Sequence, residues 1–101
     1  MEIFERLQRA FCEQPEWRVS HCQQAGGVTT PSVLCGHRFG HSPDCPRILV
    51  SAGIHGDEPA GTLALLQFLE KHGFSDAFEW LVFPALNPYG LLAGTRENAE
   101  G

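Results

Sequence analysis

The sequence has few basic residues and no cluster of them. Lys and Arg together number 7, Asp and Glu number 12, and the formal net charge is −5. Binding to a nucleic acid backbone requires concentrated positive charge, so nucleic acid is a poor candidate partner. The acidity is local, because residues 51–101 hold two basic and seven acidic side chains. This charge distribution favours a cation as a partner.

Long hydrophobic runs are also missing. The N-terminal sequence MEIFERLQRAF is charged throughout and lacks the apolar segment and the small-residue cleavage site of a secretion signal. The longest apolar runs, around ILV and WLVF, are far shorter than the roughly 20 residues that a membrane-spanning helix needs. We therefore expect a cytoplasmic protein without a membrane partner.

Paired cysteine motifs are absent. The cysteines follow one another at intervals of 10 to 13 residues, at Cys12, Cys22, Cys35 and Cys45. In a chain without a secretion signal, they are expected to be reduced thiols. His37 and His41 lie between the last two cysteines, but a closed zinc site normally uses two closely spaced ligand pairs. We interpret these cysteines and histidines as ordinary strand and turn residues.

What the sequence does have is a hydrophobic content of 43% in 101 residues, which is enough for the core of one domain. Apolar spacing and turn residues predict a regular order of elements. These are a helix over 2–13, strands over 17–20, 33–39 and 47–52, a helix over 58–72 and a strand over 79–85. Turns are expected over 26–31 and over 86–90, and a brief segment over 91–94.

The second half of this order is a βαβ pattern, which predicts an α/β fold with a mixed, largely parallel sheet and flanking helices. The strands 47–52 and 79–85 are apolar without alternation, which is typical of strands buried on both faces. One long helix between them covers only one face of the sheet. We therefore expect residues 1–101 to be the N-terminal part of a single domain, with the remaining layer after residue 101.

A candidate ligand site lies between strand 47–52 and helix 58–72, where α/β sheets bind their ligands. His55 and Glu58 are three residues apart at this corner and can converge on one point. An imidazole nitrogen and a carboxylate oxygen together suit zinc. Alone, however, His-x-x-Glu is a weak pattern. The simpler alternative remains open, in which Asp57 or Glu58 caps the following helix and His55 is a loop residue.

Three motifs in order, GIHGDEPAG, PALNPYG and TREN, resemble the N-terminal part of the zinc carboxypeptidase superfamily, whose fold is shared by the succinylglutamate desuccinylase and aspartoacylase family. The resemblance covers about residues 47–98. It implies that His55 and Glu58 are two ligands of Zn²⁺. It also implies that Arg96 is a catalytic and substrate-binding residue, which polarises the scissile carbonyl and stabilises the oxyanion.

The same resemblance implies a structural role for Asn87, Pro88 and Gly90, as the turn that shapes the floor of the active site. Tyr89 departs from the Asp that the family often has there, which leaves the substrate open. The third zinc ligand, a His, and the general base, a Glu, are expected after residue 101. We therefore expect this chain alone to be inactive, to bind zinc weakly and to self-associate through its uncovered sheet face.

The implied function is that of a zinc metallocarboxypeptidase-like hydrolase, which removes a C-terminal residue from a peptide by means of zinc-activated water. One alternative is an amidohydrolase of the desuccinylase and aspartoacylase type, acting on a small N-acyl amino acid. Another is a non-catalytic module with the same fold. The Asn-Pro-x-Gly motif favours the peptidase.

Overall fold

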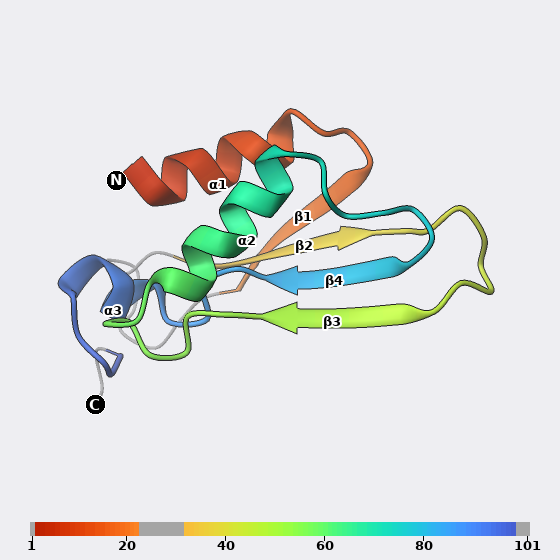
Figure 1. Cartoon of the computed structure of the whole chain (residues 1–101). Coiled ribbons are helices and arrows are strands. Elements are labelled where there is room, and N and C mark those ends of the chain that lie inside the picture. Colours follow the sequence, from red (N-terminus) through yellow and green to blue (C-terminus); the bar gives the residue numbers. More distant parts are fainter. Residues whose placement is uncertain (1, 23–31, 99–101) are drawn as a thin grey trace.

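The computed structural model describes residues 2–22 and 32–98. Its elements are α1 (Glu2–Cys12), β1 (Trp17–Cys22), β2 (Val33–Arg38), β3 (Arg47–Ser51), α2 (Ala60–Glu70), β4 (Glu79–Phe83) and α3 (Pro88–Ala93) (Figure 1). The six elements predicted from the sequence are confirmed, with ends that differ by a few residues. The turn expected over 26–31 lies outside the described residues.

The strands form one mixed sheet with the order β1-β2-β4-β3. The pairs β1–β2 and β2–β4 are antiparallel, whereas β3 and β4 run parallel, with Ile48 opposite Trp80 and Val50 opposite Val82. A parallel pair needs a crossover connection, and α2 provides it between β3 and β4. The mixed α/β fold with flanking helices is thus confirmed, but two of the three strand pairs in the described residues are antiparallel, so the sheet is not largely parallel there. Because β3 and β4 are parallel, their carboxyl ends meet at the same edge of the sheet.

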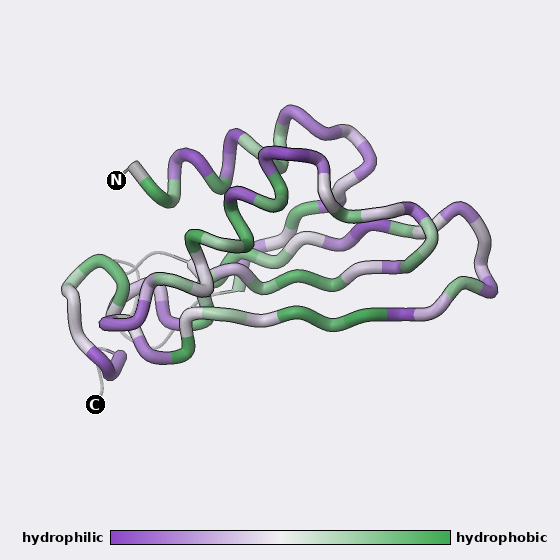
Figure 2. The backbone as a smooth tube through the Cα atoms, in the orientation of Figure 1, coloured by the Kyte–Doolittle hydropathy of each residue, from purple (hydrophilic) through white to green (hydrophobic). Residues whose placement is uncertain are grey.

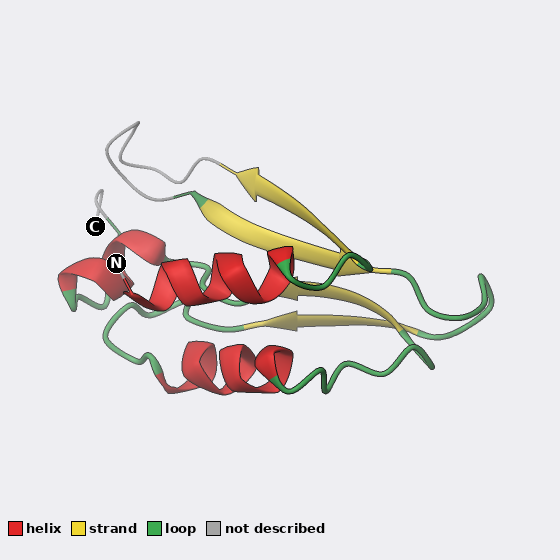
Figure 3. Ribbon diagram, turned by 90° about the horizontal axis from the view of Figure 1, so that it is seen from above, coloured by secondary structure: helices red, strands yellow, loops and turns green. Residues whose placement is uncertain are grey.

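Helices α1 and α2 lie side by side over one face of the sheet (Figures 1 and 3). They and the strands beneath them bury a single cluster, in which edge-to-face ring contacts are frequent. The ring of Trp17 packs against Phe11 and Phe74 with centroid distances of 5.2 and 5.3 Å. The buried members of the cluster are Leu7, Ala10, Phe11, Trp17, Leu34, Leu66, Leu69, Phe74 and Val82.

The opposite face of the sheet is open in the part of the chain that the structure describes. Hydrophobic residues run along β3 and β4 (Figure 2), yet Leu49 is 67% exposed and Leu81 is 37% exposed. The predicted burial of strands 47–52 and 79–85 on both faces is therefore wrong in the described residues, because α1 and α2 both pack on the other face. The prediction that the helices cover one face is confirmed. Self-association through the open face stays a prediction.

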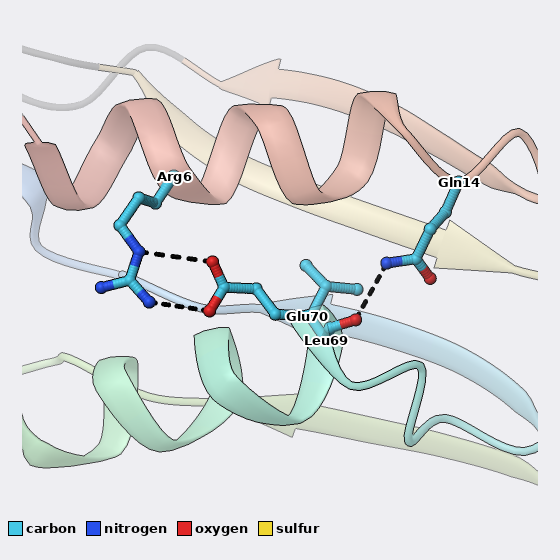
Figure 4. Close-up of polar contacts among 4 residues, drawn as sticks. All are labelled: Arg6, Gln14, Leu69 and Glu70. Atoms are coloured by element: carbon cyan, nitrogen blue, oxygen red, sulfur yellow. Dashed lines mark hydrogen bonds and ion pairs between the residues drawn. The ribbon is translucent and has the colours of Figure 1, made fainter.

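Two polar contacts join α1 to the C-terminal end of α2 (Figure 4). The guanidinium of Arg6 donates two hydrogen bonds to the Glu70 carboxylate, at 2.7 and 3.3 Å. The buried Gln14 amide donates to the carbonyl oxygens of Ala10, at 3.1 Å, and Leu69, at 2.9 Å. These contacts fix the angle between two helices of 11 residues each.

Over residues 2–22 and 32–98, no helix is long and apolar enough to cross a membrane.

Candidate active site

The candidate site lies at the edge of the sheet where β3 and β4 both end. Past the strand ends, the two connections stay joined by main-chain hydrogen bonds. The N–H of Ala52 donates to the Phe83 oxygen at 3.0 Å, and the N–H of Leu86 donates back to the Ala52 oxygen at 2.9 Å. The N–H of Asn87 then donates to the Gly53 oxygen at 2.9 Å. The connection that carries the His-x-x-Glu motif is thereby held against the one that carries Asn-Pro-x-Gly.

The structure brings His55 and Glu58 into direct contact. The distance from Nδ1 of His55 to Oε2 of Glu58 is 2.7 Å. Their side chains are 38% and 66% exposed, so both are open to solvent and to a ligand. Capping of α2 by Asp57 or Glu58 is wrong, because Pro59 occupies the N-cap position and makes no side-chain capping bond. The other part of that alternative agrees with the structure, since His55 does lie in a loop.

The two side chains of this pair are of the kinds that bind zinc. An imidazole nitrogen and a carboxylate oxygen are ligands that zinc prefers, and at 2.7 Å both atoms can reach one ion. Catalytic zinc sites commonly use three protein ligands with an open position for water. Residues 2–22 and 32–98 contain no group of three or more His, Cys, Asp or Glu side chains that could hold a metal. The pair therefore fits part of a catalytic zinc site.

The other histidines singled out in the sequence lie elsewhere and have structural contacts. Nε2 of His37 lies 2.7 Å from Oε2 of Glu79 on the open face of the sheet. This hydrogen bond, with a smaller effect from the charge of Arg47, holds the pKa of Glu79 below its usual value. His41 contacts the carbonyl oxygen of Asp76 at 2.8 Å. The interpretation of His37 and His41 as ordinary strand and turn residues agrees with these contacts.

The Asn-Pro-x-Gly motif begins a short helix that the sequence analysis missed. The expected turn over 86–90 and brief segment over 91–94 contain α3, whose N-cap is Asn87 and whose first residue is Pro88. Oδ1 of Asn87 accepts a hydrogen bond from the N–H of Gly90 at 3.0 Å. Gly94 ends the helix in the left-handed conformation with a φ of 70°. An N-cap Asn, a Pro at the first position and a closing Gly are helix signals that could have identified it.

Arg96 follows α3 and lies at the same hollow as His55 and Asn87. The hollow has a volume of about 280 Å³ and is lined by Ile54, His55, Leu86, Asn87, Arg96, Glu97 and Asn98. A larger hollow of about 420 Å³ lies between α1 and α2, but none of the predicted site residues lines it. The structure therefore brings residues from all three sequence motifs to the smaller hollow at the sheet edge.

The chain matches a known protein family over more than half of its length. The model of the succinylglutamate desuccinylase/aspartoacylase catalytic domain matches residues 44–100. This range includes the loop of His55 and Glu58, the Asn-Pro-x-Gly motif and Arg96. No curated protein matches the chain by sequence.

The chain is also similar to solved structures. A protein of Shewanella amazonensis, called a "putative metallopeptidase", has a TM-score of 0.79 and 28% identity, and the match covers 98% of this chain and 36% of that one. A protein of Shewanella baltica with the same description has a TM-score of 0.80, 25% identity and the same two coverages. An aspartoacylase family protein of Mesorhizobium loti, with a TM-score of 0.58, 20% identity and coverages of 86% and 28%, shares the fold. The chain spans about a third of the length of these proteins.

Proposed function

The chain belongs to the succinylglutamate desuccinylase/aspartoacylase catalytic domain family, which is hydrolytic, and from this premise we propose that it is the N-terminal part of a zinc-dependent hydrolase. The reaction is the cleavage of an amide bond next to a carboxylate. The observation that carries the proposal is that His55 and Arg96 line one hollow at the carboxyl ends of β3 and β4. Glu58 joins them through its contact with His55.

Each of these side chains has a separate task. His55 and Glu58 would hold the metal. A zinc ion supplies a Lewis acid that polarises a carbonyl group and lowers the pKa of water. The guanidinium of Arg96 brings a permanent positive charge to the hollow, where it stabilises the negative charge that develops on the substrate oxygen. The third ligand, a His, and the Glu that accepts the proton are proposed to lie beyond residue 101.

The first candidate substrate is the C-terminal residue of a peptide. The Asn-Pro-x-Gly motif supports it, as does 28% identity to a protein described as a "putative metallopeptidase". The second candidate is a small N-acyl amino acid, which the family match itself supports. Turnover of a blocked dipeptide by the zinc-loaded, full-length protein is therefore to be compared with turnover of N-succinylglutamate and N-acetylaspartate. A zinc-loaded protein that cleaves none of the three would support a non-catalytic module instead.

Metal content tests the assignment of the ligands. We expect about one zinc per chain in the full-length protein and a large loss of zinc in His55→Ala. The reason is that a site built from three protein ligands binds zinc weakly when only two of them remain. The matched control is His41→Ala, since His41 contacts Asp76 outside the candidate site. Elemental analysis of the three proteins decides the question. Equal zinc in the wild type and in His55→Ala would contradict the proposal.

The isolated chain of 101 residues gives a second test. With two ligands and without the general base, it should bind zinc weakly and hydrolyse none of these substrates. Zinc titration by calorimetry and an activity assay with added zinc measure both properties. Submicromolar affinity together with turnover that a chelator abolishes would show that these residues contain a complete site.

A further inference from the structure

Residues from all three sequence motifs meet at one main-chain oxygen. The carbonyl oxygen of Arg96 accepts a hydrogen bond from Nδ2 of Asn87 at 3.2 Å and another from the N–H of Gly56 at 3.2 Å. Gly56 lies between His55 and Glu58 in the sequence, and Asn87 begins α3. The position of Arg96 is therefore tied directly to the loop that carries the proposed metal ligands.

The chain reaches this junction through a tight reversal after α3. Gly94 adopts the left-handed conformation, and its N–H donates to the oxygen of Gly90. The N–H of Thr95 donates to the same oxygen at 2.9 Å. These bonds turn the chain back so that Arg96 comes to lie over the loop of Gly56. The guanidinium takes no part in the junction, which uses only the main chain of Arg96.

The junction is too tight for side chains at two of its glycines. Gly56 and Gly90 are both buried. A Cβ atom added at Gly56 would collide with the main chain of Gly90 and with the oxygen of Thr95, and one added at Gly90 would collide with the Asn87 side chain. Glycine permits this close approach because it has no side chain. Contact between the three motifs therefore depends on both glycines.

The side chain of Asn87 has two functions that only an amide combines at this position. Its Oδ1 accepts from the N–H of Gly90 at 3.0 Å, while its Nδ2 donates to Arg96. The residue is 5% exposed, so a lost partner is not replaced by bulk water. An aspartate in its place keeps the bond to Gly90 but presents an oxygen to the Arg96 carbonyl oxygen. Asn87→Asp therefore removes the hydrogen bond to Arg96 and keeps the one from Gly90.

We propose that Asn87, through its hydrogen bond to the Arg96 carbonyl oxygen, is a positioning residue that holds Arg96 in place relative to His55 and Glu58. The inference rests on the proposed function, because it assigns Asn87 a role in the chemistry of Arg96. It gives this side chain a role beyond the formation of the turn. The distinction can be measured, since formation of the turn depends on Oδ1 and the positioning of Arg96 depends on Nδ2.

A double-mutant cycle in the full-length, zinc-loaded protein tests the role in catalysis. Asn87→Asp should lower kcat about 100-fold with a much smaller change in KM, since displacement of a catalytic group by about 1 Å has this order of effect. In an Arg96→Ala background, the same substitution should lower kcat no further. The matched control is Gln67→Glu, an amide-to-carboxylate change on the exposed surface of α2, which should leave kcat unchanged. Additive losses in the cycle, or loss of zinc from Asn87→Asp, would overturn the inference.

Hydrogen exchange of glycine amides tests the geometry without an assay of activity. In protein labelled with ¹⁵N at glycine, Asn87→Asp should raise the exchange rate of the Gly56 amide at least tenfold, because its acceptor is displaced. The Gly90 amide should keep its wild-type rate, because Oδ1 is retained. Unchanged exchange at Gly56 would overturn the inference. If the wild type binds zinc but cleaves no substrate, the proposed function fails, and this measurement still decides whether Asn87 holds Arg96.

Discussion

The helix-covered core and the candidate site are held together in different ways. The core joins α1 and α2 to the sheet through large apolar side chains such as Phe11, Leu66 and Val82. At the site, the contacts are hydrogen bonds of the main chain, those of one buried amide and the His55–Glu58 contact, and the closest approaches are made by glycines. Stability is therefore expected to depend on the first region, and the precision of the chemistry on the second.

Of the changes that test this comparison, removal of a core side chain should have the largest effect, and that effect is on stability. Leu66→Ala should lower the free energy of unfolding by about 2–5 kcal/mol. Leu66 is a fully buried residue of α2, and the substitution leaves a cavity where its side chain was. The matched control is Leu63→Ala in the same helix, where the leucine is 38% exposed and the loss should be well below that of Leu66→Ala. Urea denaturation measures both. Equal losses would contradict a core centred under α2.

Substitution of Arg96 should have the reverse profile, with a large effect on chemistry and a small one on stability. Arg96→Lys should lower kcat by an amount equivalent to about 2.7–4 kcal/mol, the usual effect of losing a donor that acts on a developing oxyanion. KM should change little, and the denaturation midpoint should stay near that of the wild type. Steady-state kinetics of the full-length protein measure the effect. An unchanged kcat with a raised KM would make Arg96 a residue for substrate binding alone.

A smaller effect is expected at Glu79, which belongs to neither region because it lies on the open face of the sheet. The hydrogen bond from His37 lowers the pKa of Glu79 in the folded protein. A carboxyl group with a lowered folded pKa stabilises the fold above its unfolded pKa, and this contribution is lost as the pH falls through the folded value. The stability advantage of the wild type over Glu79→Gln should therefore shrink as the pH falls below the ordinary pKa of a glutamate and the carboxyl group is protonated. Denaturation at several pH values measures it, and an advantage that grows on acidification would refute the assignment.

The smallest effect is expected at the ion pair between Arg6 and Glu70. Both side chains are 37% exposed, and the coupling energy of such pairs is about 0.2–1 kcal/mol. A double-mutant cycle with Arg6→Gln and Glu70→Gln should give a coupling in this range that decreases at high salt, because exposed charges are screened. A larger, salt-independent coupling would show that polar contacts stabilise the helix-covered core as much as apolar packing does.

Much of the fold could be predicted from the sequence, because the spacing of apolar residues carries that information. The strand order could not, since it depends on long-range pairing that no local pattern encodes. The exposure of Leu49 was predicted wrongly for a related reason. The apolar pattern of β3 is that of a strand covered on both faces, whereas α1 and α2 cover only one in the described residues.

Part of the candidate site could likewise be predicted from the sequence, and part could not. His55, Glu58 and Arg96 were predicted from motifs, because motifs record side chains of a particular chemistry, and the structure places His55 and Arg96 at one hollow. The junction between Gly56, Asn87 and the Arg96 carbonyl oxygen could not be found, because every residue has a carbonyl oxygen and a main-chain acceptor leaves no signal in the sequence. Helix α3 did leave a signal in its capping residues, and more weight on those residues would have revealed it.

The place of β4 in the sheet affects how this chain folds during synthesis. Although β4 is the last strand along the described chain, it lies between β2 and β3. After β3 has left the ribosome, it lacks its partner strand in this sheet until residues 79–83 have also emerged. The ribosome adds about 5–20 residues per second, so this state lasts for a few seconds. During that interval Ile48, Leu49 and Val50 form an unpaired apolar segment, and this is when protection of the nascent chain by a chaperone should matter most.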